Sequence, residues 1–342
     1  MTTRQARRSG GPLAASRSKR RGPRDQREVG EDEAFDFDAV IEAWLDQDDR
    51  REHLHALDLR AFVRECGHPK LGPGQRLRKL AVYLDTKVNT HRRSALQEWE
   101  LFARIYDEAE RLAPEDSWVL HSRAITAVDL GWWRSDTGPE AEARARLLAD
   151  ALASVARGLA LDPEDPELHY LSGYVRYMHG AEQLEAALAG CERALTLKPN
   201  HPMATLYRAH CLHDLERWAE AVEAYAVVQG RTFRRNSAWR RELAREQRAF
   251  CLWRSGAIAE ALAEFESLLD EREAAVAAGD DHEWSPRLRA SPTYMALAFL
   301  SPDFEPHWLE RLRAHLEAID RPWVLERAKR ERDASKPSKT DA

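Results

Sequence analysis

Hydrophobic residues recur along this chain with the spacing of an α-helix. Between Leu168 and Val228 they stand three or four positions apart, in runs that are interrupted near Gly180, Pro199 and Pro202. Side chains with this spacing lie on one face of a helix. The pattern therefore predicts two consecutive pairs of amphipathic helices, with short turns inside each pair and a proline after the first pair.

The same layout extends to both sides of this stretch. Further helices are predicted at 99–112, 117–130, 147–161, 242–254, 258–269, 292–300, 306–319 and 323–332. Pro114 and Pro163 follow second helices in the way that Pro199 does. The longer interval between Pro114 and Pro163 indicates an insertion at 132–140. A further helix is predicted at 37–45, with Val40, Ile41, Trp44 and Leu45 on one face, and the Gly-Pro-Gly sequence at 72–74 is interpreted as a break in the chain.

Small residues give an independent register for these pairs. In four first helices a small residue precedes the predicted turn by seven positions: Ala124 and Gly131, Gly173 and Gly180, Ala209 and Glu216, Ala249 and Gly256. Only a small side chain fits where two helices cross closely, and glycine suits the turn after a helix. The predicted second helices carry alanine at the equivalent crowded position.

In these residues the chain resembles the tetratricopeptide repeat (TPR) family, whose usual repeat is about 34 residues long. The resemblance implies an all-α fold, a right-handed α-solenoid of helical hairpins with N- and C-terminal capping helices. We expect a disordered basic arm at 1–33, an N-terminal helical cap at 34–93, the repeat array at 94–300, C-terminal capping helices at 301–333 and a disordered tail at 334–342.

Charge is unevenly distributed along the chain. The net charge is −6, but the first 30 residues carry nine lysines and arginines against two acids, so this arm is at +7 and the rest is at −13. The arm is either a solvated tail or a contact for nucleic acid or another polyanion. No apolar run approaches the length of a membrane span and no signal peptide is recognisable, so a cytoplasmic location is expected.

Neither catalytic motifs nor ligand clusters stand out. No glycine-rich phosphate loop, G-x-S-x-G or HExxH motif is present, so no enzymatic activity and no cofactor are predicted. The four cysteines form no CxxC pair and are expected to be buried, reduced thiols. His210 and His213 flank Cys211, but on a helix Cys211 points away from them, so no metal site is predicted.

In TPR proteins the first helix of every pair lines the inner surface. One helical stripe, set by the small residues, should therefore face a partner: His121, Ile125, Tyr170, Tyr174, Tyr177, Leu206, His210, His213, Phe250 and Trp253. Aromatic side chains of this kind suit an extended peptide or a partner helix. The alternative is that some of them pack against neighbouring repeats or are covered by the chain itself. The Lys, Arg and Asn residues of the TPR proteins that capture chaperone carboxylates are absent from the stripe.

A basic cluster precedes the fourth pair. Its candidates for binding a phosphate or an acidic motif are Arg234, Arg235, Arg240 and Arg241. The alternative is that the arginines of this region pair with nearby acidic helices. The sequence thus predicts a scaffold that binds a protein partner. The alternatives are a regulatory adaptor whose basic arm contacts nucleic acid or another polyanion while the repeats recruit a protein, and a self-assembling subunit.

Overall fold

The computed structural model describes residues 35–48, 50–87, 95–132, 139–233, 238–278 and 293–334. Within these ranges the regular structure is α-helix with two short 3-10 turns, and no strand occurs. The expected arm at 1–33 and residues 335–342 of the expected tail lie outside the described residues. None of the helices in the described ranges has both the length and the apolar character needed to cross a membrane.

The chain divides into two units, 1–57 and 58–342. The first unit contains α1 (Phe37–Leu45), which begins where the Asp36 carboxylate accepts a hydrogen bond from the Ala39 amide. Ile41, Trp44 and Leu45 lie on its buried face, as their spacing predicted. A 3-10 turn at Leu54–Ala56 follows.

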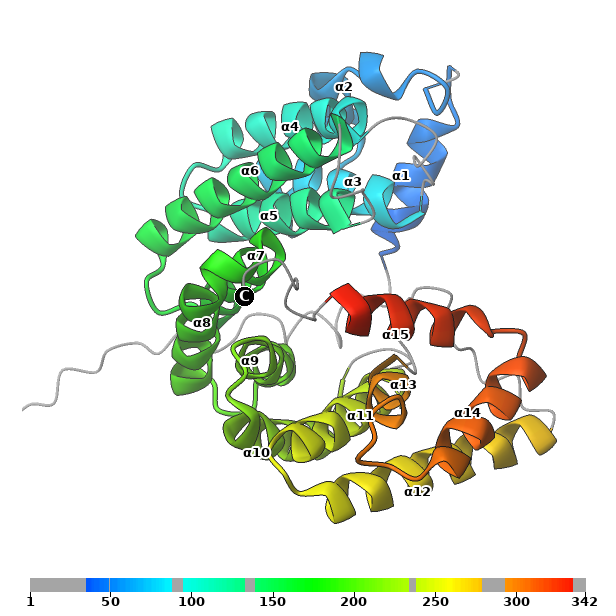
Figure 1. The fold of residues 1–342 in the computed structure, drawn as a ribbon. Coiled ribbons are helices and arrows are strands. Elements are labelled where there is room, and N and C mark those ends of the chain that lie inside the picture. Colours follow the sequence, from blue (N-terminus) through cyan, green and yellow to red (C-terminus); the bar gives the residue numbers. More distant parts are fainter. Residues whose placement is uncertain are drawn as a thin grey trace, which may run out of the picture. The chain divides into compact units, whose positions relative to one another are not determined.

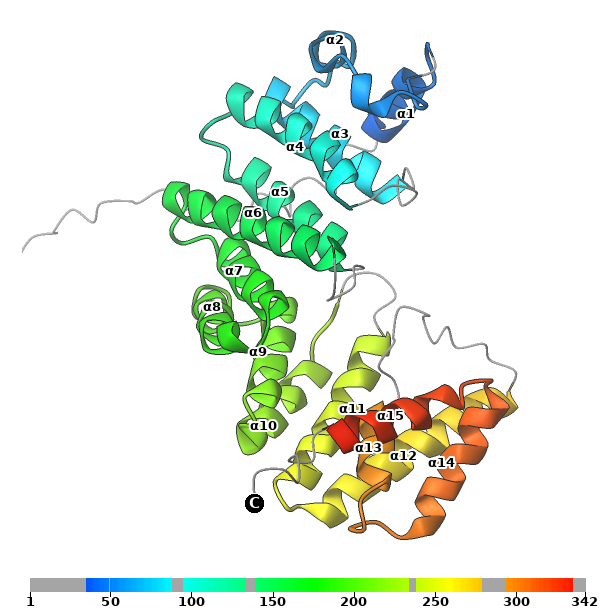
Figure 2. The same ribbon diagram turned by 45° about the horizontal axis from the view of Figure 1, so that its top comes forward.

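The second unit consists of helical hairpins that stack in sequence order (Figures 1 and 2). Its helices are α2 (Leu59–Glu65), α3 (Pro73–Lys87), α4 (Ala95–Leu112), α5 (Ser117–Trp132), α6 (Pro139–Leu161), α7 (Pro166–His179), α8 (Leu184–Leu197), α9 (Pro202–Asp214), α10 (Trp218–Gln229), α11 (Ala238–Arg254), α12 (Ile258–Ala277), α13 (Thr293–Phe299), α14 (Pro306–Ala318) and α15 (Trp323–Ala334). Each pair from α3 and α4 to α11 and α12 packs together, and the first helices α3, α5, α7 and α9 contact one another in a row. The predicted all-α fold of TPR-like hairpins is confirmed.

Local sequence signals explain where the central helices begin. Pro166 and Pro202 occupy the first turn of α7 and α9, where a missing amide hydrogen costs nothing. Asp165 caps α7 by accepting hydrogen bonds from two amides, and the Nδ1 atom of His201 accepts one from Ala204 at 3.1 Å. The amides that a helix leaves unpaired at its start are therefore satisfied by side chains.

Gly173 lies at a tight helix crossing, and the other predicted small residues are buried. A Cβ atom added to Gly173 would lie 2.7 Å from the Ala187 carbonyl oxygen, so α7 and α8 touch backbone to backbone. Ala124, Ala209 and Ala249 are fully buried. The backbone angle φ is positive at Gly180, Glu216 and Gly256, which confirms three of the four predicted turns.

Two details differ from the sequence prediction. The chain does not turn at Gly131, because α5 continues through it to Trp132. Pro73 and Gly74, which were interpreted as a break, instead begin α3, which pairs with α4. Gly74 permits this pairing, since a Cβ atom there would lie 2.6 Å from Cβ of Ala113.

The last three helices pack on the end of the stack. Helix α13 contacts α11, and both α14 and α15 contact α13 (Figure 2). Phe299 and Phe304 pack against Phe265 of α12, with ring centroids 5.5 and 6.3 Å away. The predicted helices at 306–319 and 323–332 correspond to α14 and α15.

Candidate functional site

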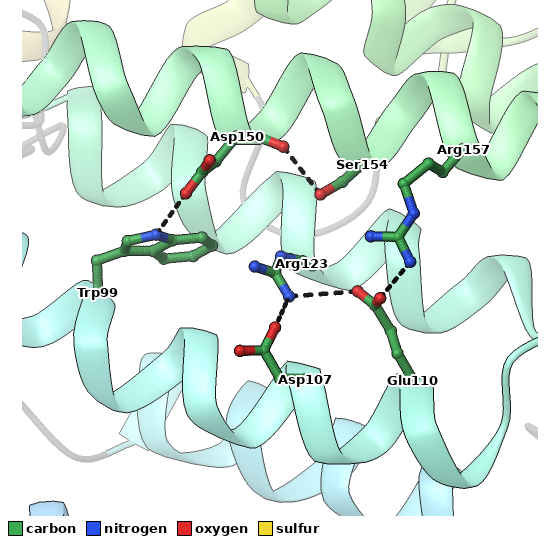
Figure 3. Close-up of polar contacts among 7 residues, drawn as sticks. All are labelled: Trp99, Asp107, Glu110, Arg123, Asp150, Ser154 and Arg157. Carbon is green, nitrogen blue, oxygen red and sulfur yellow. Dashed lines mark hydrogen bonds and ion pairs between the residues drawn. The ribbon is translucent and has the colours of Figure 1, made fainter.

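A polar network fixes the second hairpin against α4 (Figure 3). Arg123 of α5 donates hydrogen bonds to Asp107 at 2.5 Å and to Glu110 at 3.3 Å, and Glu110 also pairs with Arg157 of α6. The indole nitrogen of Trp99 donates to Asp150 of α6 at 2.8 Å. Because each of these carboxylates has a partner within the protein, the network orients helices and offers no evident ligand site.

Helices α7 and α9 bring several aromatic rings together. The ring of Tyr207 lies 4.7 Å from that of Tyr174, 5.4 Å from that of Tyr177 and 5.5 Å from that of His210. These four side chains are half-buried, and we call them the aromatic face. Tyr170 stacks against Tyr174 at 5.9 Å but is itself buried. The face therefore combines residues from two adjacent first helices.

Tyr207 is the member of this face that the predicted stripe missed. The stripe instead contained its neighbour Leu206, which is 5% exposed and belongs to the core. Tyr207 lies on the side of α9 that meets α7, so it contacts three tyrosines of the preceding hairpin. The tyrosines spaced along α7 were the available signal, since aromatic residues on adjacent first helices tend to meet.

The far part of the stripe is covered by the chain itself. Phe250 and His213 are 6% and 5% exposed, and their rings lie 5.2 and 5.0 Å from that of Tyr294 on α13. Trp253 donates its indole hydrogen to Asp303 at 2.9 Å. Phe250 and His213 are therefore packed internally, as the alternative interpretation of the stripe expected, whereas Trp253 is half-buried.

The near part of the stripe lies on α5. His121 and Ile125 are half-buried, and the His121 ring lies 4.9 Å from that of Trp118. One helical turn beyond Ile125, Asp129 is exposed and acts electrostatically on Tyr174 and Tyr207.

Two aspartates flank the aromatic face. Solvent reaches Asp129, yet desolvation by the surrounding helices and the Asp85 carboxylate raise its pKa to about 7. Asp214 at the end of α9 is also exposed, and partial burial raises its pKa although the Tyr177 hydroxyl opposes the rise. Side chains that are accessible and yet partly desolvated lie in recessed surroundings.

Burial keeps the two histidines of α9, His210 and His213, neutral at physiological pH. Burial lowers the pKa of His210 to about 3 and that of His213 to about 4. The Nδ1 atom of His210 lies 2.9 Å from the Tyr225 hydroxyl, and that of His213 lies 3.3 Å from Sγ of Cys251. Within the described part of the chain, no three His, Cys, Asp or Glu side chains are grouped so that they could hold a metal ion.

The predicted basic cluster is only partly described. Arg234 and Arg235 lie outside the described residues. Arg240 lies 5.9 Å from the Phe233 ring and acts on Tyr207, while Arg241 is exposed. Two arginines further along α11 pair with acids of α12, Arg245 with Glu271 and Arg248 with Glu264, as the alternative interpretation expected.

Several solved structures are similar to parts of this chain. The solved structure of YrrB, described as a TPR protein with an unusual peptide-binding site, matches with 18% identity over 66% of this chain and 97% of its own, at a TM-score of 0.41. The chain is similar to TPR proteins in fold. MamA matches with 18% identity over 59% of this chain and 94% of its own, at a TM-score of 0.43. IFIT1, solved as a monomeric mutant with Gppp-AAAA, matches with 14% identity over 86% of this chain and 66% of its own, at a TM-score of 0.42. No protein-family model and no curated protein sequence matches the chain.

Proposed function

We propose that this protein is a non-enzymatic TPR-like scaffold that binds an extended segment of a partner protein on its aromatic face. The observation that carries the proposal is the cluster of half-buried rings that Tyr174 and Tyr177 of α7 form with Tyr207 and His210 of α9. Because α7 and α9 are adjacent first helices, a single extended segment can contact all four side chains.

The chemistry of these rings suits protein recognition. Tyrosine offers a large apolar surface with a polar tip and loses little rotamer entropy on binding. These rings are already held by one another, so little further order is needed when a partner binds. Leu206 and Phe250 of the stripe are only 5% and 6% exposed and are not proposed as contacts.

The test is a peptide-display selection on the full chain. We expect peptides selected on the wild type to lose at least about tenfold in affinity with Tyr174→Ala or Tyr207→Ala, since removing a central aromatic contact costs about 2 kcal/mol. Trp323→Ala is the matched control, because Trp323 of α15 is 43% exposed and does not belong to the face. Thermal unfolding of each variant shows whether it remains folded.

The competing function is the adaptor whose basic arm contacts a polyanion. IFIT1 was solved with Gppp-AAAA, but that concerns IFIT1, and this chain shares only 14% of its sequence over the matched region. Removal of residues 1–33 separates the two functions. A salt-sensitive association with RNA that disappears with the arm, together with peptide binding that ignores Tyr174 and Tyr207, would favour the adaptor.

A further inference from the structure

We infer that the segment bound by the aromatic face is basic, with lysine or arginine side chains that lie over the tyrosine rings and pair with Asp129 and Asp214. The inference rests on the proposed function and names the chemistry of the partner. Neither aspartate pairs with a lysine or arginine of the described residues, and each acts on a tyrosine of the aromatic face.

Asp129 and Asp214 differ from two carboxylates of the hairpin that lies between them in the chain, α7 and α8. Glu167 accepts hydrogen bonds from Lys198 at 2.8 Å and from His201 at 2.9 Å, and Glu192 pairs with Arg208 at 3.3 Å. In the described part of the chain, no lysine or arginine pairs with Asp129 or Asp214, although both are exposed. A partner's cation would supply the missing charge.

The two carboxylates stand at different ends of the aromatic face. Asp129 acts on Tyr170, Tyr174 and Tyr207. Asp214 interacts with Tyr177, one helical turn further along α7. A cation beside either aspartate would therefore be near a tyrosine ring, and the electron-rich face of such a ring attracts a guanidinium or an ammonium group.

The balance of nearby charge also favours a cation. Two carboxylates of the described residues, Asp129 and Asp214, act on tyrosines of this face. Against these acids stands Arg240, which acts on Tyr207 and lies over the Phe233 ring. An acidic peptide or a nucleic-acid phosphate would meet the carboxylates of Asp129 and Asp214 at this face, and like charges brought together repel.

The direct test uses labelled oligopeptides and fluorescence anisotropy on the full chain at low salt and at pH 8, where the Asp129 carboxyl, with a pKa of about 7, is ionised. We expect a peptide of alternating serine and arginine to bind, and peptides of alternating serine with glutamine or with glutamate not to bind detectably. In the Asp129→Asn/Asp214→Asn variant we expect the arginine peptide to bind about tenfold more weakly, because charge-assisted hydrogen bonds are lost. These substitutions remove no internal ion pair, so the variant should fold.

The matched control is Glu260→Gln/Glu317→Gln, which changes the net charge equally at exposed positions on α12 and α14. Equal weakening in the control and in the Asn variant would show general charge attraction and would overturn the inference. Detectable binding of the glutamate peptide or of single-stranded RNA at the aromatic face would overturn the inference as well.

Failure of the inference can be told apart from failure of the proposed function. If displayed peptides selected on the wild type depend on Tyr174 and Tyr207 but carry no excess of lysine or arginine, the scaffold function stands and the inference is wrong. If the selected peptides bind irrespective of the tyrosines, the function itself is wrong.

Discussion

A Cβ atom added to Gly190 of α8 would lie 2.9 Å from Cα of Gly173 on α7, so the two helices are in backbone contact at these glycines. An alanine at Gly173 would also place its Cβ 2.8 Å from Sγ of Cys191. We expect Gly173→Ala to destabilise the protein by about 1 to 3 kcal/mol, because the helices must separate. This expected loss exceeds the gain in helix stability of up to about 1 kcal/mol that comes from replacing glycine with alanine. Denaturant unfolding measures the difference.

The control for this prediction is Gly131→Ala on α5. Gly131 is also helical, but its nearest neighbours, Cγ of Arg144 and Cβ of Leu147, lie 3.7 and 3.8 Å from the added Cβ, which is ordinary contact. The free energy of unfolding should stay the same or rise by about 0.5 kcal/mol. Equal losses in the two variants would mean that the crossing at Gly173 is not specially close.

Glu246 should be among the residues on which the end of the stack depends most. Its buried carboxylate accepts hydrogen bonds from Arg272 of α12 at 2.8 Å and from the Met295 amide at the start of α13 at 3.0 Å. Removing one partner of a buried ion pair leaves the other charge in the core. We expect Glu246→Ala to cost about 3 to 5 kcal/mol in unfolding free energy.

Glu266→Ala on α12 serves as the comparison for Glu246→Ala, because this glutamate is exposed. The unfolding free energy of the Glu266→Ala variant should differ from that of the wild type by less than about 0.5 kcal/mol. Limited proteolysis should cleave near α13 faster in the Glu246 variant. A Glu246 variant as stable as the wild type would show that α13 is held mainly by its apolar contacts.

Local patterns explain why much of the fold could be predicted. Helix spacing, the small residue at Gly173 and the turns at Gly180 and Gly256 follow from the sequence alone, since each depends on neighbours within a single hairpin. The pairing of α3 with α4 was missed because the Gly-Pro-Gly sequence was interpreted as a break, whereas Pro73 begins a helix.

The site was harder to predict because burial depends on distant segments. Nothing in the spacing around Phe250 reveals that Tyr294 of α13 will cover it. Tyr207 was missed for a related reason. Its neighbour Leu206 fits the stripe by register, but contact between α7 and α9 decides which of the two side chains joins the tyrosines.

His213 should make the protein less stable in mild acid. Burial lowers its pKa from 6.5 to about 4, so the unfolded state takes up a proton first. The stabilising contribution is complete above about pH 6.5 and is lost as the pH falls towards 4. At pH 5 the loss should be about 2 kcal/mol, with 1.36 kcal/mol for each pH unit below the unfolded pKa.

Urea unfolding at pH 7.5 and at pH 5 measures this loss. The phenyl ring of His213→Phe can stack on Phe250 as the imidazole does. In this variant the difference in unfolding free energy between pH 7.5 and pH 5 should shrink. His307→Gln, at an exposed position, should leave it unchanged. An unchanged pH dependence in His213→Phe would show that His213 is already protonated or solvated in the folded protein.

Asp129 should titrate near neutral pH. Desolvation and the Asp85 carboxylate raise its pKa from 3.8 to about 7. The tyrosines on which Asp129 acts stay neutral in this range, because burial raises the pKa values of Tyr170, Tyr174 and Tyr207. A raised pKa in the folded state means that stability is lost as the pH rises from 3.8 through 7. Asp129→Asn should remove this loss, and Asp85→Asn should lower the pKa measured by carbon NMR of the Asp129 carboxyl group.

Binding of a cation should shift the same titration. An arginine side chain beside Asp129 favours the ionised carboxylate, so the serine–arginine oligopeptide should lower the pKa of Asp129, and its affinity should rise as the pH increases through 7. Asp129→Asn should make the affinity independent of pH in this range. A pKa that does not move when the peptide saturates the protein would place the bound cation away from Asp129, even if the tyrosines proved essential for binding.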